Sequence, residues 1–135
     1  MNYVIDCESI SKSYGNISAL RDVSLKLEKG SFLAIFGPNG AGKTTLLKIL
    51  SNLIKPTSGA VKINSIPLDN EDGEIRKNIG VVSHNTFLYN NLTPYENLEF
   101  YGRMYDVPDL KKRIAEVIDE VGLTARMYDP VRTFS

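Results

Sequence analysis

Residues 37–44 constrain the fold more than any other part of the sequence. They read Gly-Pro-Asn-Gly-Ala-Gly-Lys-Thr and match the pattern G-x-x-x-x-G-K-[ST] at every fixed position. Residues 32–36, directly before them, are all apolar, which is typical of a strand covered on both faces. Residues 46–53, directly after them, repeat apolar side chains at helical spacing. The sequence therefore predicts a buried strand, a phosphate-binding loop and an amphipathic helix in succession.

The residue types of this loop suit a nucleotide phosphate bound with magnesium. Glycines let the backbone curl so that N–H groups point at phosphate oxygens, and the next helix adds its N-terminus. Lys43 supplies a positive charge for the β- and γ-phosphates and is the expected catalytic cation. Thr44 offers a hydroxyl to Mg²⁺, which prefers oxygen ligands. The alternative is a glycine-rich turn that only joins a strand to a helix.

The remaining hydrophobic pattern predicts an α/β chain. Strands are expected at residues 3–9, 23–27, 61–63 and 79–82. A helix is expected from Thr93 to about Tyr105, because Thr93 precedes Glu96 by three positions and Pro94 takes the first helical place. A second helix is expected over residues 110–121, with Gly122 at its end.

Composition places the chain among soluble globular proteins. Lys plus Arg and Asp plus Glu both number 16, so a general electrostatic attraction to nucleic acid is not expected. The longest apolar run, residues 32–36, is far shorter than the ~20 residues of a membrane helix. The only cysteine, Cys7, fits a reducing compartment and is expected to be a buried packing residue. We therefore expect a cytoplasmic protein without a secretory leader.

Several features, in order along the chain, resemble the nucleotide-binding domain of ABC transporters. Tyr14 stands upstream of the loop, where this family has an aromatic residue that stacks on adenine. Residues 56–59 and 92–98 resemble the stretch after the first helix and the entry to the helical subdomain, and residues 134–135 resemble the start of the signature motif. The cofactor-binding residues implied are Tyr14, Gly37, Asn39, Gly40, Ala41, Gly42, Lys43, Thr44 and Thr45.

The resemblance implies an α/β P-loop NTPase fold of the ABC type. Residues 1–31 would form an antiparallel β portion, residues 32–91 the P-loop core with a Q-loop-like region, and residues 92–135 the start of a helical subdomain. It also implies an ATPase that uses ATP and Mg²⁺, forms a head-to-tail homodimer or heterodimer, and drives transport through permease subunits at the inner face of the membrane. Residues 82–89 and 131–135 are most similar to the ATP-binding subunit of the cytochrome-c-maturation haem exporter.

Two other classes share the phosphate loop. One is an ABC ATPase without membrane spans, coupled to ribosomes or DNA repair. The other is a small phosphotransferase such as a nucleotide kinase, although Tyr14 and the residues after Thr93 fit it poorly.

The chain departs from the family pattern at two places. His84 stands where the family usually has a glutamine that touches Mg²⁺ and the attacking water, so the resemblance implies a catalytic and metal-contacting position for it. We favour a glutamine-like positional role over acid–base chemistry, and the alternative is a surface residue that simply replaces the amide. The catalytic Asp-Glu strand has no match, because Asp119 and Glu120 follow a helical pattern and are expected to be solvated. We therefore expect the C-terminal half of the domain to be missing, with weak Mg²⁺-nucleotide binding and poor hydrolysis. Exposed apolar surface near residues 32–36 is expected to promote self-association.

Aromatic residues gather in the expected helix after Thr93. Packing explains them better than a surface for a membrane partner, because aromatic residues at helical spacing usually belong to a core. They are Tyr95, Phe100, Tyr101 and Tyr105.

Overall fold

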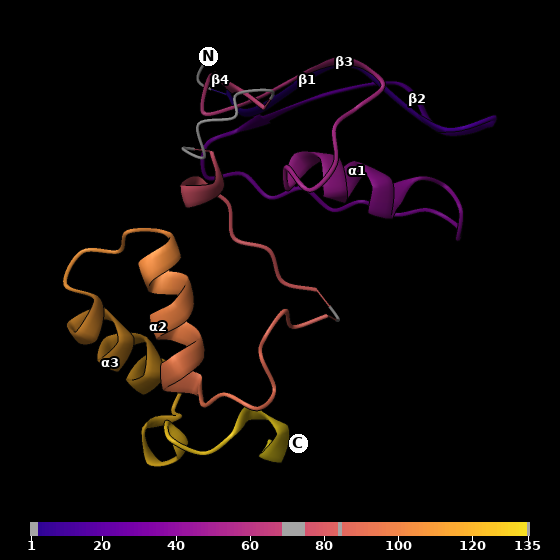
Figure 1. Ribbon diagram of the computed structural model, residues 1–135. Coiled ribbons are helices and arrows are strands. Elements are labelled where there is room, and N and C mark those ends of the chain that lie inside the picture. The colour runs from indigo at the N-terminus through magenta and orange to yellow at the C-terminus, as the bar shows by residue number, and fades with distance from the viewer. Residues whose placement is uncertain (1–2, 69–74, 84, 135) are drawn as a thin grey trace. The chain divides into compact units, whose positions relative to one another are not determined.

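The computed structural model describes residues 3–68, 75–83 and 85–134. The chain forms two compact units, Met1–Val81 and Val82–Ser135. In Figure 1 the first unit begins in indigo with a sheet and a helix, and the second runs from orange to yellow with helices. No helix among the described residues is both long and apolar enough to cross a membrane.

The first unit is built on a four-stranded antiparallel sheet. Its strands are β1 (Tyr3–Tyr14), β2 (Ile17–Glu28), β3 (Ser58–Ile63) and β4 (Ile66–Pro67), in the order β2-β1-β3-β4. The strands predicted at residues 3–9, 23–27 and 61–63 are confirmed. β1 and β2 run further than predicted because they pair along their whole length up to a tight turn at Gly15.

The helix α1 (Lys43–Leu50) packs against this sheet (Figure 1). Ile10 of β1 and Ile49 of α1 are both fully buried, so the apolar face of the helix meets the inner face of the sheet. Cys7 lies in the same core as predicted, and burial, followed by the nearby Asp6 charge, raises the pKa of its thiol to about 11. The buried members of this core are Cys7, Ile10, Leu20, Leu46, Ile49, Leu50, Val61, Ile63, Leu68 and Ile75.

The prediction of a buried strand at residues 32–36 is wrong. The segment carries no strand, and Phe32 and Phe36 are 91% and 89% exposed. A strand that is apolar on both faces needs hydrogen-bonded neighbours, and none of the described strands β1–β4 pairs with this segment. The strand predicted at residues 79–82 is absent for the same reason. The expected exposed apolar surface is therefore present at Phe32 and Phe36.

The second unit contains the two predicted helices, α2 (Pro94–Met104) and α3 (Leu110–Glu120). The N-terminal signal of α2 is confirmed as a capping box: the Thr93 hydroxyl accepts the Glu96 N–H at 3.1 Å, and the Glu96 carboxylate accepts the Thr93 N–H at 2.8 Å. The two helices approach closely where α2 carries Gly102, because a Cβ there would lie 2.1 Å from a Leu110 methyl carbon.

Packing inside the second unit tests two predictions, the helix at Asp119 and Glu120 and the packing of the aromatic residues after Thr93. Asp119 and Glu120 lie exposed in the last turn of α3 while Ile118 is buried, which confirms a helix with solvated acids. The Tyr101 hydroxyl donates to the Phe87 carbonyl at 2.5 Å, and the Tyr95 ring lies 5.7 Å from that of Tyr128. These contacts favour packing for Tyr95 and Tyr101, whereas Phe100 and Tyr105 are 45% and 38% exposed.

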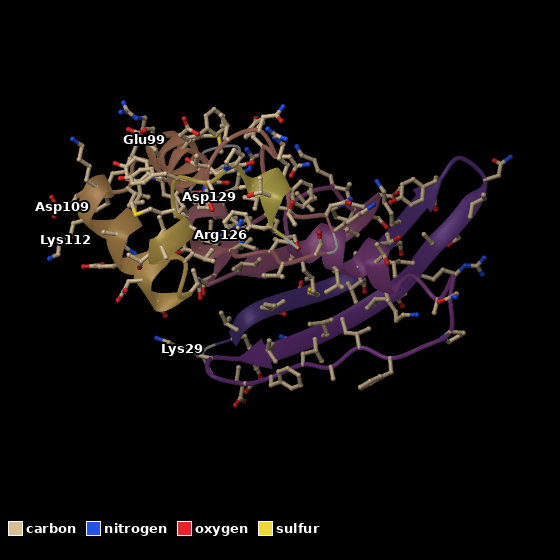
Figure 2. The ribbon with its side chains drawn as sticks, turned by 90° about the horizontal axis from the view of Figure 1, so that it is seen from below. Lys29, Glu99, Asp109, Lys112, Arg126 and Asp129 are labelled. Atoms are coloured by element: carbon tan, nitrogen blue, oxygen red, sulfur yellow. The ribbon has the colours of Figure 1, made fainter. Side chains whose placement is uncertain are left out.

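The end of the described chain folds back on its own unit. The Arg126 guanidinium forms an ion pair with Asp129 at 2.9 Å, and both side chains are labelled in Figure 2. The same guanidinium donates to the Thr133 carbonyl and lies 4.0 Å from the centre of the Phe134 ring. Through these contacts Arg126 stabilises the position of the segment that leads to Phe134.

Candidate nucleotide-binding site

The glycines of the phosphate loop have left-handed backbones. Gly40 has φ of 83° and Gly42 has φ of 93°, a region that side-chain-bearing residues rarely adopt. Gly42 is also crowded, because a Cβ there would lie 2.4 Å from the Ala19 carbonyl oxygen. Ala19 is the extra residue of a β-bulge, since Lys12 pairs with Leu20 while Ser13 pairs with Ser18. Strand β2 therefore comes so close to the loop that only glycine fits at this position.

The start of α1 presents backbone donors. The first bond into the helix runs from the Leu46 N–H to the Gly42 carbonyl at 2.9 Å. The N–H groups of Lys43, Thr44 and Thr45 come before it, and none of them has an acceptor among the described residues. Unpaired donors at the positive end of the helix dipole attract anions. The backbone at this end of α1 is thus suited to phosphate oxygens.

The side chains at the same place add a positive charge and a hydroxyl. The Lys43 ammonium donates to the carbonyls of Gly37 and Pro38, at 2.5 and 2.6 Å, so its charge lies over the beginning of the loop. Thr44 is exposed, and Thr45 is half-buried. A Thr44 hydroxyl fits Mg²⁺, because this ion takes oxygen ligands and the hydroxyl that follows the lysine of such a loop is typically one of them. Among the residues described, no group of three or more His, Cys, Asp or Glu could hold a metal ion.

Tyr14 lies at the end of the β1–β2 hairpin and is 49% exposed. It pairs with Ile17, and Ala19, which crowds Gly42, is two residues further along β2, a span of about 7 Å. In Figures 1 and 2 the hairpin turn and the phosphate loop lie at the same end of the unit. The structure therefore brings Tyr14 and residues 37–45 to one end of the unit, whereas His84 lies outside the described residues.

The sequence interpretation missed two contributors to this site, Ala19 and Lys12. Nothing in the hydrophobic pattern marks Ala19, because a bulge depends on how two distant strands pair. Lys12 could have been found: it lies two residues before Tyr14 in a strand, so both side chains share one face. Its ammonium lies 5.3 Å from the centre of the Tyr14 ring.

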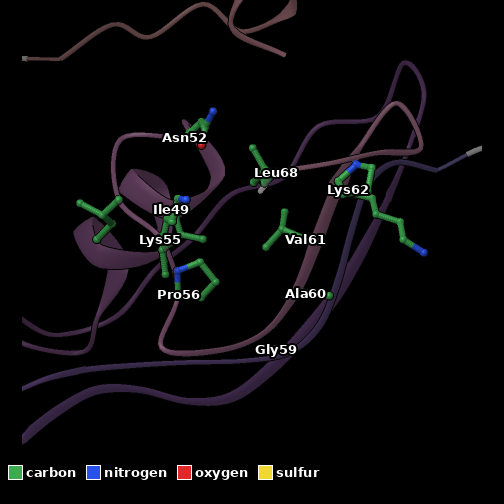
Figure 3. A pocket seen from close by; sticks show the side chains of 11 residues that line it. Ile49, Asn52, Lys55, Pro56, Gly59, Ala60, Val61, Lys62 and Leu68 are labelled. Atoms are coloured by element: carbon green, nitrogen blue, oxygen red, sulfur yellow. The ribbon is translucent and has the colours of Figure 1, made fainter. Parts of the chain in front are cut away.

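A cavity of about 360 Å³ lies at the other end of α1, beside β3 (Figure 3). Ile49, Val61 and Leu68 line it, and the amine of Lys62 points away from it in Figure 3. This mostly apolar hollow offers little to a phosphate, so we place the candidate site at the loop.

The chain is similar to ABC transporter proteins over most of its length. The family model described as ABC transporter matches residues 20–135. The linearmycin resistance ATP-binding protein LnrL of Bacillus subtilis is 38% identical over 98% of this chain and 43% of its own length. The sulfate/thiosulfate import ATP-binding protein CysA of Nitrosomonas europaea is 35% identical over 88% of this chain and 34% of its own length. The chain thus spans less than half of these relatives.

Solved structures show the same fold. An ATP-binding subunit of an ABC transporter superposes with a TM-score of 0.85 at 27% identity, covering 98% of this chain and 56% of that chain. A dimeric structure of the ATP-binding cassette MJ0796, in a post-hydrolysis state with ADP and Pi, superposes with a TM-score of 0.81 at 31% identity. That match covers 97% of this chain and 63% of the other. The predicted fold class is therefore confirmed.

Proposed function

Because the chain belongs to the ABC transporter family, we propose that its phosphate loop binds Mg²⁺-ATP in the ATP-binding subunit of a transporter. The observation that carries this proposal is the start of α1, where the N–H groups of Lys43, Thr44 and Thr45 have no acceptor among the described residues, together with the Lys43 ammonium over the beginning of the same loop. That arrangement supplies charge and directed donors to a polyphosphate chain.

Each site residue then has a proposed role. Tyr14 stacks on the adenine base, and the backbone of residues 37–45 binds the phosphates. Lys43 turns from the loop carbonyls to the β- and γ-phosphates, where its charge stabilises both the bound nucleotide and the charge that builds up during hydrolysis. Thr44 holds Mg²⁺ through its hydroxyl, and the metal supplies further charge neutralisation when bound. His84 takes the positional role of the family glutamine.

The partners proposed are a second ATP-binding domain and membrane permease subunits. The solved relative MJ0796 is dimeric and carries ADP and Pi, which supports nucleotide-linked pairing for this chain as well. In this proposal residues 1–31 form the antiparallel β portion, residues 32–91 the P-loop core, and residues 92–135 begin the helical subdomain, in a head-to-tail dimer beneath the permease.

Haem export in cytochrome c maturation is a narrower proposal for the transported substrate. It rests on the resemblance of residues 82–89 and 131–135, while the relatives named above are linked by their names to linearmycin resistance and sulfate/thiosulfate import. Co-purification of the chain with haem-binding membrane subunits from its own cell would support it, and co-purification with an unrelated permease would reject it.

Calorimetric titration with Mg²⁺-ATP tests the nucleotide proposal. We expect the wild-type chain to bind and Lys43→Ala to lose most of its affinity. Lys48→Ala is the matched control, because Lys48 is an exposed lysine in the last turn of the same helix and should bind like wild type. Circular dichroism confirms that each variant is folded. A folded wild type that takes up no nucleotide, or equal binding by Lys43→Ala, would overturn the proposal.

A further inference from the structure

We propose that Lys12 is a positioning residue for Tyr14 that holds one face of its ring and leaves the opposite face for a purine base. This inference rests on the proposed function, because it deepens the role of Tyr14 in nucleotide binding. The Lys12 ammonium lies 5.3 Å from the centre of the Tyr14 ring, inside the distance of about 6 Å at which a cation is attracted to an aromatic face.

The Lys12 ammonium is itself held in place. It donates to the Lys55 carbonyl at 2.8 Å, and an ammonium has three donors, so one group can serve both the carbonyl and the ring. The side chain of Lys12 is half-buried, in contrast to the exposed Tyr14. Lys12 is therefore a fixed cation beside the ring, not a lysine that moves freely in solvent.

Two further hydrogen bonds join the end of β1 to the segment after α1. The Ser13 N–H donates to the Thr57 hydroxyl at 3.0 Å, and the Thr57 N–H donates to the Ser11 carbonyl at 2.8 Å. Residues 55–57 follow the C-terminal end of α1, and α1 begins at the phosphate loop. The position of the Tyr14 ring is thus tied to the helix that would hold the phosphates.

Holding the ring in advance favours base stacking. A half-exposed tyrosine that moves freely loses side-chain freedom when a base stacks on it, and this loss weakens binding. A ring already ordered by Lys12 loses less. The effect concerns the base only, so Lys12 should alter the affinity for a nucleotide relative to the affinity for its phosphate chain alone.

The same sheet contains a matched control. The Lys26 ammonium lies 5.1 Å from the centre of the Tyr3 ring, at the opposite end of β1 from Tyr14. Lys26→Met removes the same charge and the same type of ring contact as Lys12→Met. It leaves the hairpin end next to the phosphate loop unchanged.

The test compares two ligands, Mg²⁺-ATP and magnesium with inorganic tripolyphosphate, by calorimetric titration of the full chain. The ratio measured is the dissociation constant for tripolyphosphate divided by that for Mg²⁺-ATP. It isolates the contribution of the base, because a general loss of positive charge weakens both ligands, and it falls when ATP alone binds more weakly. We expect Lys12→Met to weaken ATP relative to tripolyphosphate by about two- to five-fold, as for a cation over an exposed ring. Lys12→Arg should restore the ratio, because arginine keeps a cation over the ring. Lys26→Met should leave the ratio as in wild type.

Further variants distinguish a failure of the Lys12 inference from a failure of the proposed role of Tyr14. Tyr14→Ala should lower the ratio at least as far as Lys12→Met. If it does so while Lys12→Met has no effect, the Lys12 inference is wrong and the proposed role of Tyr14 stands. If neither Tyr14→Ala nor Lys12→Met changes the ratio, the Lys12 inference and the proposed role of Tyr14 are both wrong. If the wild-type chain binds neither Mg²⁺-ATP nor tripolyphosphate, the proposed function is wrong as well. Should Lys12→Met not fold, Lys12→Gln removes the charge with a polar side chain and is expected to lower the ratio in the same way.

Discussion

Gly42→Ala tests the crowded approach of β2 to the phosphate loop. The new Cβ would lie 2.4 Å from the Ala19 carbonyl oxygen and 2.7 Å from a Leu20 methyl carbon. The left-handed backbone at φ of 93° adds roughly 1–2 kcal/mol of strain for alanine. Overpacking against a backbone carbonyl adds about 1–3 kcal/mol. Together these terms destabilise the first unit by about 2–5 kcal/mol.

Gly40→Ala is the matched control for this prediction. Gly40 has nearly the same backbone, with φ of 83°, but a Cβ there meets nothing within 4 Å. It should therefore show only the backbone strain of roughly 1–2 kcal/mol. The difference between the two variants measures the clash with the bulge alone.

Thermal unfolding followed by circular dichroism gives the comparison. Because 1 kcal/mol shifts the melting temperature of a small domain by about 4–8 °C, Gly42→Ala should melt at least about 4 °C below Gly40→Ala. Equal melting temperatures for the two variants would refute the argument, since the contact with Ala19 would then contribute nothing to the free energy of unfolding.

Four other predictions concern capping, pH dependence, self-association and thiol reactivity. Thr93→Ala should lower the stability of the second unit by about 1 kcal/mol in urea unfolding, because it removes the hydroxyl of the capping box. The hydrogen bond from the Thr93 N–H lowers the pKa of the Glu96 carboxyl below 4.5. The stabilisation by Glu96 should therefore be complete above pH 4.5 and be lost as the pH falls through the lowered pKa. A urea midpoint that does not change between pH 6 and pH 3 would contradict this prediction. The double variant Phe32→Ser, Phe36→Ser should sediment as a monomer at concentrations where the wild type self-associates, and a monomeric wild type would contradict the role of these exposed rings. Cys7, buried with a raised pKa, should react with iodoacetamide only after unfolding, and rapid labelling of the folded chain at pH 8 would show that it is accessible.

Features set by a few neighbouring residues were predictable from the sequence. The helix after Thr93 begins where predicted because its cap, proline and glutamate lie within four positions and need no distant partner. The glycines at positions 40 and 42 were predicted to give the loop its curvature, and both have left-handed backbones.

Features that depend on distant pairing were not predictable. The apolar run at residues 32–36 has the composition of a buried strand, but a strand forms only where neighbouring strands offer hydrogen bonds, and in the part of the chain that is described Phe32 remains exposed. The contact of Ala19 with Gly42 arises from a bulge in the β1–β2 pairing, which periodicity does not show. The role of His84 stays a prediction.

The most direct measurement of the central claim is an NMR titration of the ¹⁵N-labelled chain with Mg²⁺-ATP. If the positive end of α1 binds the phosphates, the largest amide shifts will occur at Lys43, Thr44 and Thr45, whose N–H groups precede the first helical bond. Unchanged loop amides, with the largest shifts instead at the start of α3 near Lys111 and Lys112, would contradict the account.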